Sequence, residues 1–209
     1  WVARQVTPYV ELLDSWRWGR DRATWGKSVD IRLASRSDVP NVMALETRYY
    51  RDNLDTSEQA EGFISIRHSR AWFDAAVDSA GLHVAVSPDG EVVGFIAVTD
   101  PPTREEAEAS PIMRAILGCV ETVEFDGAPI AQQKYALRGP VLVDRSARGT
   151  GMYSAFNAVT RLAYRDRFDL GVIFVAADNP RSLRTTTTKL GAEPVALFDA
   201  DSRAYHLLV

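Results

Sequence analysis

Residues 135–156 read YALRGPVLVDRSARGTGMYSAF, and this stretch decides how the rest of the chain is interpreted. Its first nine residues predict a strand, and the apolar spacing after Gly151 predicts an amphipathic helix. Between them, Arg148 precedes Gly149 and Gly151, and glycine allows backbone conformations that are closed to other residues. The first N–H groups of a helix have no internal partner and attract anions. The stretch therefore predicts a phosphate-binding turn, with a tight turn that binds nothing as the alternative.

Two familiar phosphate motifs fit this turn poorly. A nucleoside-triphosphate loop needs Lys followed by Ser or Thr after its second glycine, but Met152 and Tyr153 stand there. A dinucleotide fingerprint is closer, with Asp178 ending the next predicted strand, but its third glycine is Ser154. About 30 residues follow Asp178, which is too few to complete a doubly wound nucleotide domain.

Composition excludes several classes of protein. The 209 residues carry a net charge of −4, which argues against nucleic-acid binding driven by bulk charge. One cysteine and three scattered histidines provide no set of metal ligands. No apolar run approaches about 18 residues, so we expect no membrane span. The start of the sequence has no apolar signal core, and we expect a cytoplasmic protein.

The remainder of the chain predicts a mixed α/β domain. Residues 82–99 read as a hairpin around Asp89-Gly90, and residues 120–130 as a second one around Asp126-Gly127. The run GVIFVA at 171–176 is typical of a buried parallel strand. Asn179-Pro180 opens a helix that ends at Lys189-Leu190-Gly191, and the last sixteen residues predict an antiparallel pair.

Residues 1–28 stand apart as a predicted N-terminal helical extension. They hold four of the five tryptophans, and Tyr9, Leu12, Leu13 and Trp16 fall on one helical face. We expect this face to pack on its own domain. The alternative is a homodimer contact, since aromatic residues are enriched at interfaces.

With these elements placed, residues 29–209 resemble the GNAT family of N-acetyltransferases. The family signature, Gln/Arg-x-x-Gly-x-Gly/Ala, is matched by Arg148 and Gly151, although its last position is Tyr153 here. The segment NPRSLRTTTTKLGA, residues 179–192, resembles the second motif of the family. The resemblance implies a mostly antiparallel sheet with a central parallel strand pair and flanking helices.

The resemblance also implies acetyl-CoA as the cofactor and a set of residues that bind it. The backbone of the turn would hold the pyrophosphate of CoA, and the strand before it would line the pantetheine arm. The residues expected at this site are Val141, Leu142, Val143, Arg148, Gly149, Thr150, Gly151, Met152, Tyr153, Asn179 and Ser182. For Asn179, helix capping alone is an equal alternative.

The catalytic groups are less well defined. The resemblance implies a backbone N–H of Leu142 or Val143 as the oxyanion donor. Glu121 and Glu124 are candidates for a base, which the sequence does not assign. The family often uses a tyrosine to protonate the leaving thiolate, and this tyrosine is absent here. Its position is Thr186 when counted forward from Asn179 and Thr187 when counted back from Gly191.

We therefore predict an acetyl-CoA-dependent N-acetyltransferase in which an amine attacks the thioester directly in a ternary complex. The acceptor, a small-molecule or peptide amine, cannot be identified from the sequence. The missing tyrosine motivates an alternative, a non-catalytic sensor or scaffold that binds acyl-CoA.

Overall fold

The computed structural model describes residues 29–108 and 110–209. In this part of the chain seven strands form one sheet, and a separate short hairpin pairs β4 (Glu124–Phe125) with β5 (Ala128–Pro129). The order across the large sheet is β1 (Asp30–Leu33), β2 (Leu82–Val86), β3 (Val92–Thr99), β6 (Tyr135–Val143), β7 (Leu170–Ala176), β9 (Arg203–Leu208) and β8 (Pro194–Ala200).

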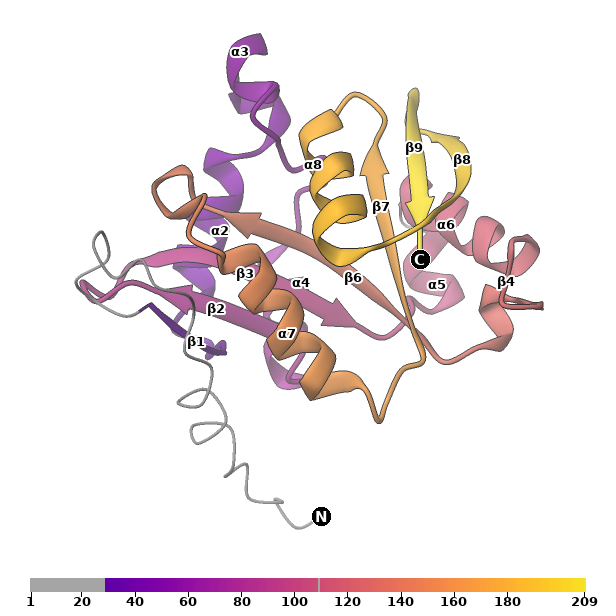
Figure 1. The fold of residues 1–209 in the computed structure, drawn as a ribbon, viewed down its shortest axis with the longest axis horizontal. Helices are drawn as coiled ribbons and strands as arrows, with labels where there is room; N and C mark the ends of the chain where they lie inside the picture. Colours follow the sequence, from indigo (N-terminus) through magenta and orange to yellow (C-terminus); the bar gives the residue numbers. More distant parts are fainter. Residues whose placement is uncertain (1–28, 109) are drawn as a thin grey trace.

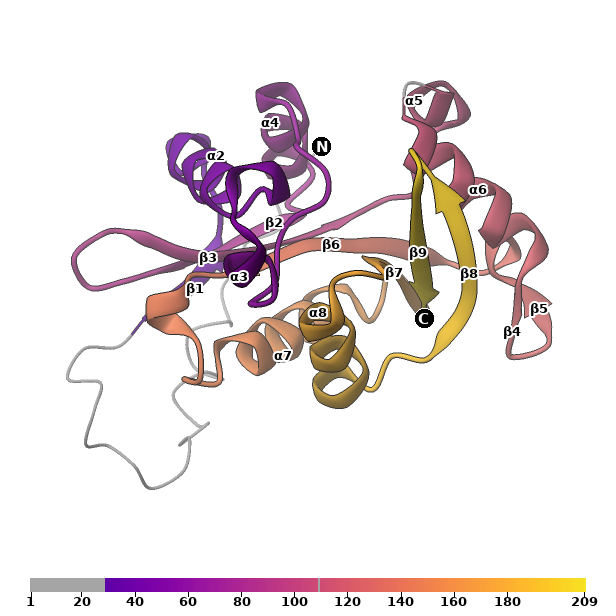
Figure 2. The ribbon, with the colours of Figure 1, turned by 90° about the horizontal axis from the view of Figure 1, so that it is seen from above.

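Helices cover both faces of this sheet (Figures 1 and 2). One face carries α2 (Val39–Arg48), α4 (Arg70–Asp78), α5 (Arg104–Glu108) and α6 (Pro111–Thr122). The other face carries α7 (Met152–Tyr164) and α8 (Pro180–Thr185), which continues into the π-helix η4 (Thr186–Leu190). Shorter helical turns are η1 (Arg51–Asn53), α3 (Thr56–Gln59), η2 (Ile130–Gln132) and η3 (Arg145–Ala147).

All strand pairs of the large sheet are antiparallel except β6 with β7. This confirms the predicted mixed α/β class, with a mostly antiparallel sheet and a central parallel pair. The predicted hairpin over residues 82–99 is present as β2 and β3, and the last sixteen residues pair as β8 and β9. The second predicted hairpin is shorter than expected, because residues up to Thr122 belong to α6.

The alternation of side chains along β6 connects the two sides of the core. Leu142 packs with Phe95 and Phe73 in the cluster beneath α2 and α4. Its neighbours Val141 and Val143 point to the opposite face, where they pack against the cluster that contains Met152 and Phe156 of α7. Packing on both faces therefore holds the end of β6 in place where the chain enters the glycine turn.

The predicted helix and the dimer contact within residues 1–28 lie outside the described residues. Among those that the structure describes, no helix is long and apolar enough to cross a membrane. The same residues contain no group of three or more His, Cys, Asp or Glu side chains that could hold a metal ion.

Candidate functional site

Strands β6 and β7 separate after a short stretch of parallel pairing. They are in register only from Tyr135 opposite Leu170 to Leu137 opposite Val172. Beyond this point β7 pairs with β9, whereas β6 continues along β3 alone. The edge of β6 that faces away from β3 is therefore left without a strand partner over its last six residues, in the described part of the chain.

The direction of the backbone groups on this edge follows from one hydrogen bond. The N–H of Asp144 donates to the carbonyl of Val93 on β3, with an N···O distance of 2.8 Å. Backbone groups alternate in direction along an extended strand, so the N–H of Leu142 also points toward β3. The N–H groups of Val141 and Val143 then face the open edge, where a ligand could pair with them.

The glycine turn leads from this edge into α7. Gly149 and Gly151 have φ angles of +81° and +87°, and a β-carbon added to either would meet nothing within 4 Å. Gly151 is the N-cap residue, and no side chain caps the helix. The N–H groups of Met152, Tyr153 and Ser154 therefore lack intrahelical partners, as those of any first turn do.

Asp144 organises the chain between β6 and the turn. Its carboxylate accepts hydrogen bonds from the N–H and hydroxyl of Ser146, at 2.9 and 2.6 Å, and from Arg48 at 2.9 Å. Burial alone would raise the pKa of Asp144. The hydrogen bonds from Ser146 and Tyr49 and the charge of Arg48 outweigh burial, so the pKa is lowered and the group stays ionised.

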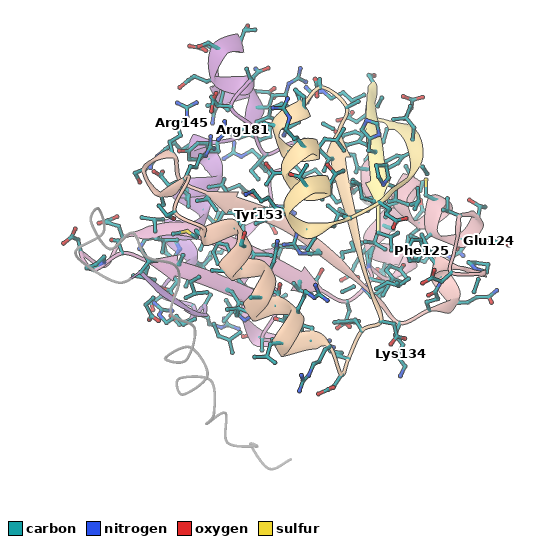
Figure 3. All side chains as sticks on the ribbon, viewed as in Figure 1. Glu124, Phe125, Lys134, Arg145, Tyr153 and Arg181 are labelled. Atoms are coloured by element: carbon teal, nitrogen blue, oxygen red, sulfur yellow. The ribbon has the colours of Figure 1, made fainter. Side chains whose placement is uncertain are left out.

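Three arginines near the turn are linked to α3 and to the segment that follows it. Arg148 donates to the carbonyls of Val143 and Glu61, at 3.1 and 2.7 Å. Arg181 binds the carboxylate of Glu61, and Arg145 binds that of Glu58 at 3.1 Å. Figure 3 shows Arg145 and Arg181 at the same end of the molecule, near α3 and the start of α8. This end is therefore rich in cations that are only partly neutralised.

These elements enclose a cavity of about 400 Å³. One wall is the open edge of β6 with the glycine turn and the first turn of α7. The second wall is α8 and η4, and the third is the segment from Glu61 to Ile64 together with Tyr49. The cavity thus combines unpaired strand backbone, free helical N–H groups and arginines.

The sequence matches no family model and no curated protein. Several solved structures match the fold. An acetyltransferase of the GNAT family from Listeria monocytogenes is 12% identical with a TM-score of 0.55, and the match covers 86% of this chain and 92% of that chain. The described part of this chain has the GNAT fold.

Two other structures with the same fold were determined with bound ligands. Arabidopsis thaliana NAA60 in complex with acetyl-CoA is 14% identical with a TM-score of 0.56, over 87% of this chain and 97% of that chain. The NatC complex bound to Gag peptide and CoA is 11% identical with a TM-score of 0.56, over 87% and 96%.

Within this GNAT fold, most of the predicted cofactor residues line one cavity. They are Val141, Leu142, Val143, Arg148, Gly149, Gly151, Met152, Tyr153 and Ser182. Thr150 does not line it, and its hydroxyl donates to the carbonyl of Ala147 at 2.8 Å. Asn179 is buried, caps α8 by accepting from the N–H of Ser182 at 3.2 Å, and donates to the carbonyl of Phe63 at 2.9 Å.

The two glutamates considered as bases lie elsewhere in the GNAT fold. Glu121 lies in the last turn of α6 and pairs with Arg104 at 3.0 Å, and Glu124 belongs to the β4–β5 hairpin. Neither lines the cavity, and Figure 3 shows Glu124 at one edge of the molecule, well away from Tyr153 near the centre of the view. The carboxylate that does line the cavity, Glu61, is bound to Arg181 and lies 3.8 Å from Arg148.

Sequence reasoning missed the third wall. Tyr49, Glu61, Phe63 and Ile64 carry no motif and lie about 80 or more residues before the turn that they face. The capping box of α3, in which Asp55 and Glu58 bond each other's backbone, was a readable local signal. It predicts a short helix but not the wall that this helix positions.

Proposed function

We propose that this protein is an acyl-CoA-dependent N-acyltransferase, with acetyl-CoA as the donor substrate, and that residues 29–209 are its catalytic domain. One observation carries the proposal: the unpaired edge of β6 leads directly into an uncapped helix N-terminus, and both line the same cavity. The likeness of the fold to acetyltransferases supports it, including the structures with acetyl-CoA and CoA.

The chemistry of the cavity fits this donor. The open edge of β6 suits the amide groups of a pantetheine arm, which would pair with it like an added strand. The free N–H groups of residues 152–154 and the positive end of the helix dipole suit a pyrophosphate. Arg181 lines the cavity and supplies additional positive charge, and Arg145 lies at the same end of the molecule (Figure 3).

Direct transfer requires an oxyanion donor, and we assign it to Val143 rather than to Leu142. The carbonyl oxygen of a thioester gains negative charge as an amine attacks, and a preorganised N–H stabilises that charge. The N–H of Leu142 is used toward β3, whereas that of Val143 faces the cavity. Arg148 donates to the carbonyl of Val143 at 3.1 Å, which ties the end of β6 to the turn next to this N–H.

The acceptor is an amine, and it must lose a proton before it attacks. A lysine-like amine has a pKa of about 10.4, so its reactive neutral form is scarce at neutral pH. Glu61 is bound to arginines and is poorly placed to act as a base. We therefore propose that water carries this proton away, and we leave the acceptor as a small-molecule or peptide amine.

The test combines binding and turnover. The melting temperature of the protein should rise with CoA or acetyl-CoA and not with NAD, because a ligand that binds only the folded state stabilises it. Release of the CoA thiol is then followed with acetyl-CoA and a panel of amines that includes peptides with free N-termini. Turnover with at least one amine supports the proposal. Tight CoA binding without turnover would indicate a sensor, and an NAD shift without a CoA shift would indicate a dinucleotide site.

A further inference from the structure

Two positions at which this sequence departs from the GNAT motifs are in contact. Position 153, where the family signature has glycine or alanine, carries a tyrosine, and position 186, one of the two candidates for the missing tyrosine, carries a threonine. The hydroxyl oxygens of Tyr153 and Thr186 are 3.4 Å apart. Position 186 in η4 therefore lacks the tyrosine of the family, but the phenol of Tyr153 on α7 lies next to this position.

The π-helix at the end of α8 explains why Thr186 and not Thr187 faces this phenol. A π turn contains one residue more than an α turn, so counting from the two ends of the segment gives positions that differ by one. Thr186 is 2% exposed and points to Tyr153. The hydroxyl of Thr187 instead donates to the carbonyl of Leu183 at 3.0 Å, within its own helix.

A buried cation lies beside the phenol ring. The guanidinium carbon of Arg138 is 5.6 Å from the centre of the Tyr153 ring. Arg138 is 9% exposed, and one of its terminal nitrogens donates to Asn157 on α7. Its other terminal nitrogen has no hydrogen-bond partner, and no described carboxylate forms an ion pair with this side chain. A buried positive charge without a counter-ion favours negative charge on a neighbouring group.

Tyr153 is also open to the donor substrate. It is partly exposed, stands on the first turn of α7 between this helix and α8 in Figure 3, and lines the cavity with Val141, Val143 and Thr185. Arg138 lies on β6 at the point where β6 and β7 separate, since the last paired residue is Leu137. The phenol and the cation are therefore at the inner end of the open strand edge.

We propose that Tyr153 is a catalytic residue that donates its phenolic proton to the CoA thiolate as the thiolate leaves. This inference rests on the proposed function. The amine nitrogen forms its bond to the carbonyl carbon, the carbon–sulfur bond breaks with its electron pair on sulfur, and the sulfur takes the proton of Tyr153. The proton lost by the amine returns to the phenolate through water. Arg138 is a positioning residue that stabilises the transient phenolate.

The experiment compares Tyr153→Phe with the unaltered protein, using acetyl-CoA and the best amine from the panel. We expect kcat to fall about 100-fold, since a general acid contributes on that order or more. The KM for acetyl-CoA and the Kd for CoA, measured by calorimetry, should stay within about threefold. Tyr164→Phe is the matched control, because it removes a phenol from the same helix outside the cavity, and it should retain turnover.

A second pair of variants keeps the test informative if the ring itself is needed for packing. Tyr153→Ala should lose turnover, and Tyr153→Ala combined with Thr186→Tyr should recover at least tenfold, because the phenol returns from the facing helix. Turnover in the unaltered protein together with kcat of Tyr153→Phe within threefold would overturn this inference alone. No turnover in the unaltered protein with any amine would overturn the proposed function and this inference with it.

A variant of Arg138 tests its positioning role separately. Arg138→Gln removes the charge and keeps a donor, and we expect a fall in kcat with little change in KM, in the same direction as Tyr153→Phe. In the Tyr153→Phe background the same change should have almost no further effect on kcat, because there is no phenolate left to stabilise. An equal fall in both backgrounds would show that Arg138 supports only the packing.

Discussion

Arg148 has its guanidinium occupied by protein acceptors. It donates to the carbonyls of Val143 and Glu61, and its guanidinium carbon lies 5.3 Å from the ring centre of Tyr49. Burial lowers the pKa of this arginine, and the opposing effect of Tyr49 is smaller, yet an arginine remains charged at neutral pH. Its main contribution is to join the turn to the wall from Glu61 to Ile64.

Arg148→Ala should therefore affect stability more than CoA binding. Two hydrogen bonds from a charged donor are lost, and we expect the free energy of unfolding to fall by about 2 kcal/mol. The Kd for CoA should rise less than tenfold, because the backbone donors of residues 152–154 remain. Denaturant titration and calorimetry measure the two effects, with the exposed Arg161→Ala on α7 as the control. A large loss of affinity without loss of stability would show that Arg148 binds the ligand directly.

Thr187, unlike Thr186, should have no role near the phenol of Tyr153. Its hydroxyl bonds only to backbone carbonyls of its own helix, those of Leu183 and Arg184. Thr187→Ala should lower kcat less than about tenfold, far below the effect of removing a general acid. The measurement is kcat at saturating acetyl-CoA and acceptor. A hundredfold fall with intact CoA affinity would place this side chain in the chemistry.

Sequence reasoning predicted single residues best where backbone geometry demanded them. Gly149 and Gly151 have the positive φ angles that the turn implied, and Asn179 caps its helix as expected. The contact between Tyr153 and Thr186 was not predicted, because it depends on how α7 and α8 pack together. The sequence could not decide whether Thr186 or Thr187 occupies the position of the family tyrosine, because no residue pattern predicts the π turn of η4.

Local sequence patterns were sufficient to predict several strands but not how two of them pair. Alternating or continuous apolar residues predicted β2, β3, β6 and β7, and the Asp89-Gly90 turn predicted the first hairpin. The same patterns did not predict where β6 and β7 separate, because apolar runs look alike whether or not a neighbour pairs with them. From Ile173 onward β7 pairs with β9, on the side of β7 away from β6, so the separation depends on a pairing with a strand that lies outside both runs.

His83 on β2 should make the stability of the folded protein depend on pH. Burial lowers the pKa of this imidazole from 6.5 to about 4, and its Nδ1 has no hydrogen-bond partner. The folded protein keeps His83 neutral where the unfolded chain is already protonated, so stability is complete above pH 6.5 and is lost as the pH falls toward 4. We expect a loss of about 2 kcal/mol between about pH 8 and about pH 5 from this group.

Denaturant titration at each pH measures this loss, and His83→Leu should remove most of it. His206→Gln on β9 is the control, and it should keep the pH dependence of the unaltered protein. An unchanged slope in His83→Leu would show that other groups cause the acid sensitivity.

Among residues 29–108 and 110–209, those that line the cavity lie between Tyr49 and Lys189. A protein that begins at Ser28 should therefore bind CoA with the affinity of the longer chain, even if it loses stability or changes its mass in light scattering. The helix predicted within residues 1–28, with its aromatic face packed on its own domain or, as the alternative, in a homodimer contact, stays a prediction. A well-folded truncated protein with weak CoA binding would contradict the assignment of the site.

The central claim is that CoA binds at the glycine turn between β6 and α7, and Gly151→Val tests it most directly. Gly90→Val is a matched control, because Gly90 has a φ of +86° and open surroundings like Gly151 but lies in the β2–β3 turn, away from the cavity. Both variants carry similar backbone strain and should lose similar stability. Calorimetric titration with CoA should give an unchanged Kd for Gly90→Val and a loss of at least tenfold for Gly151→Val. Equal CoA affinity in the two folded variants would contradict the site.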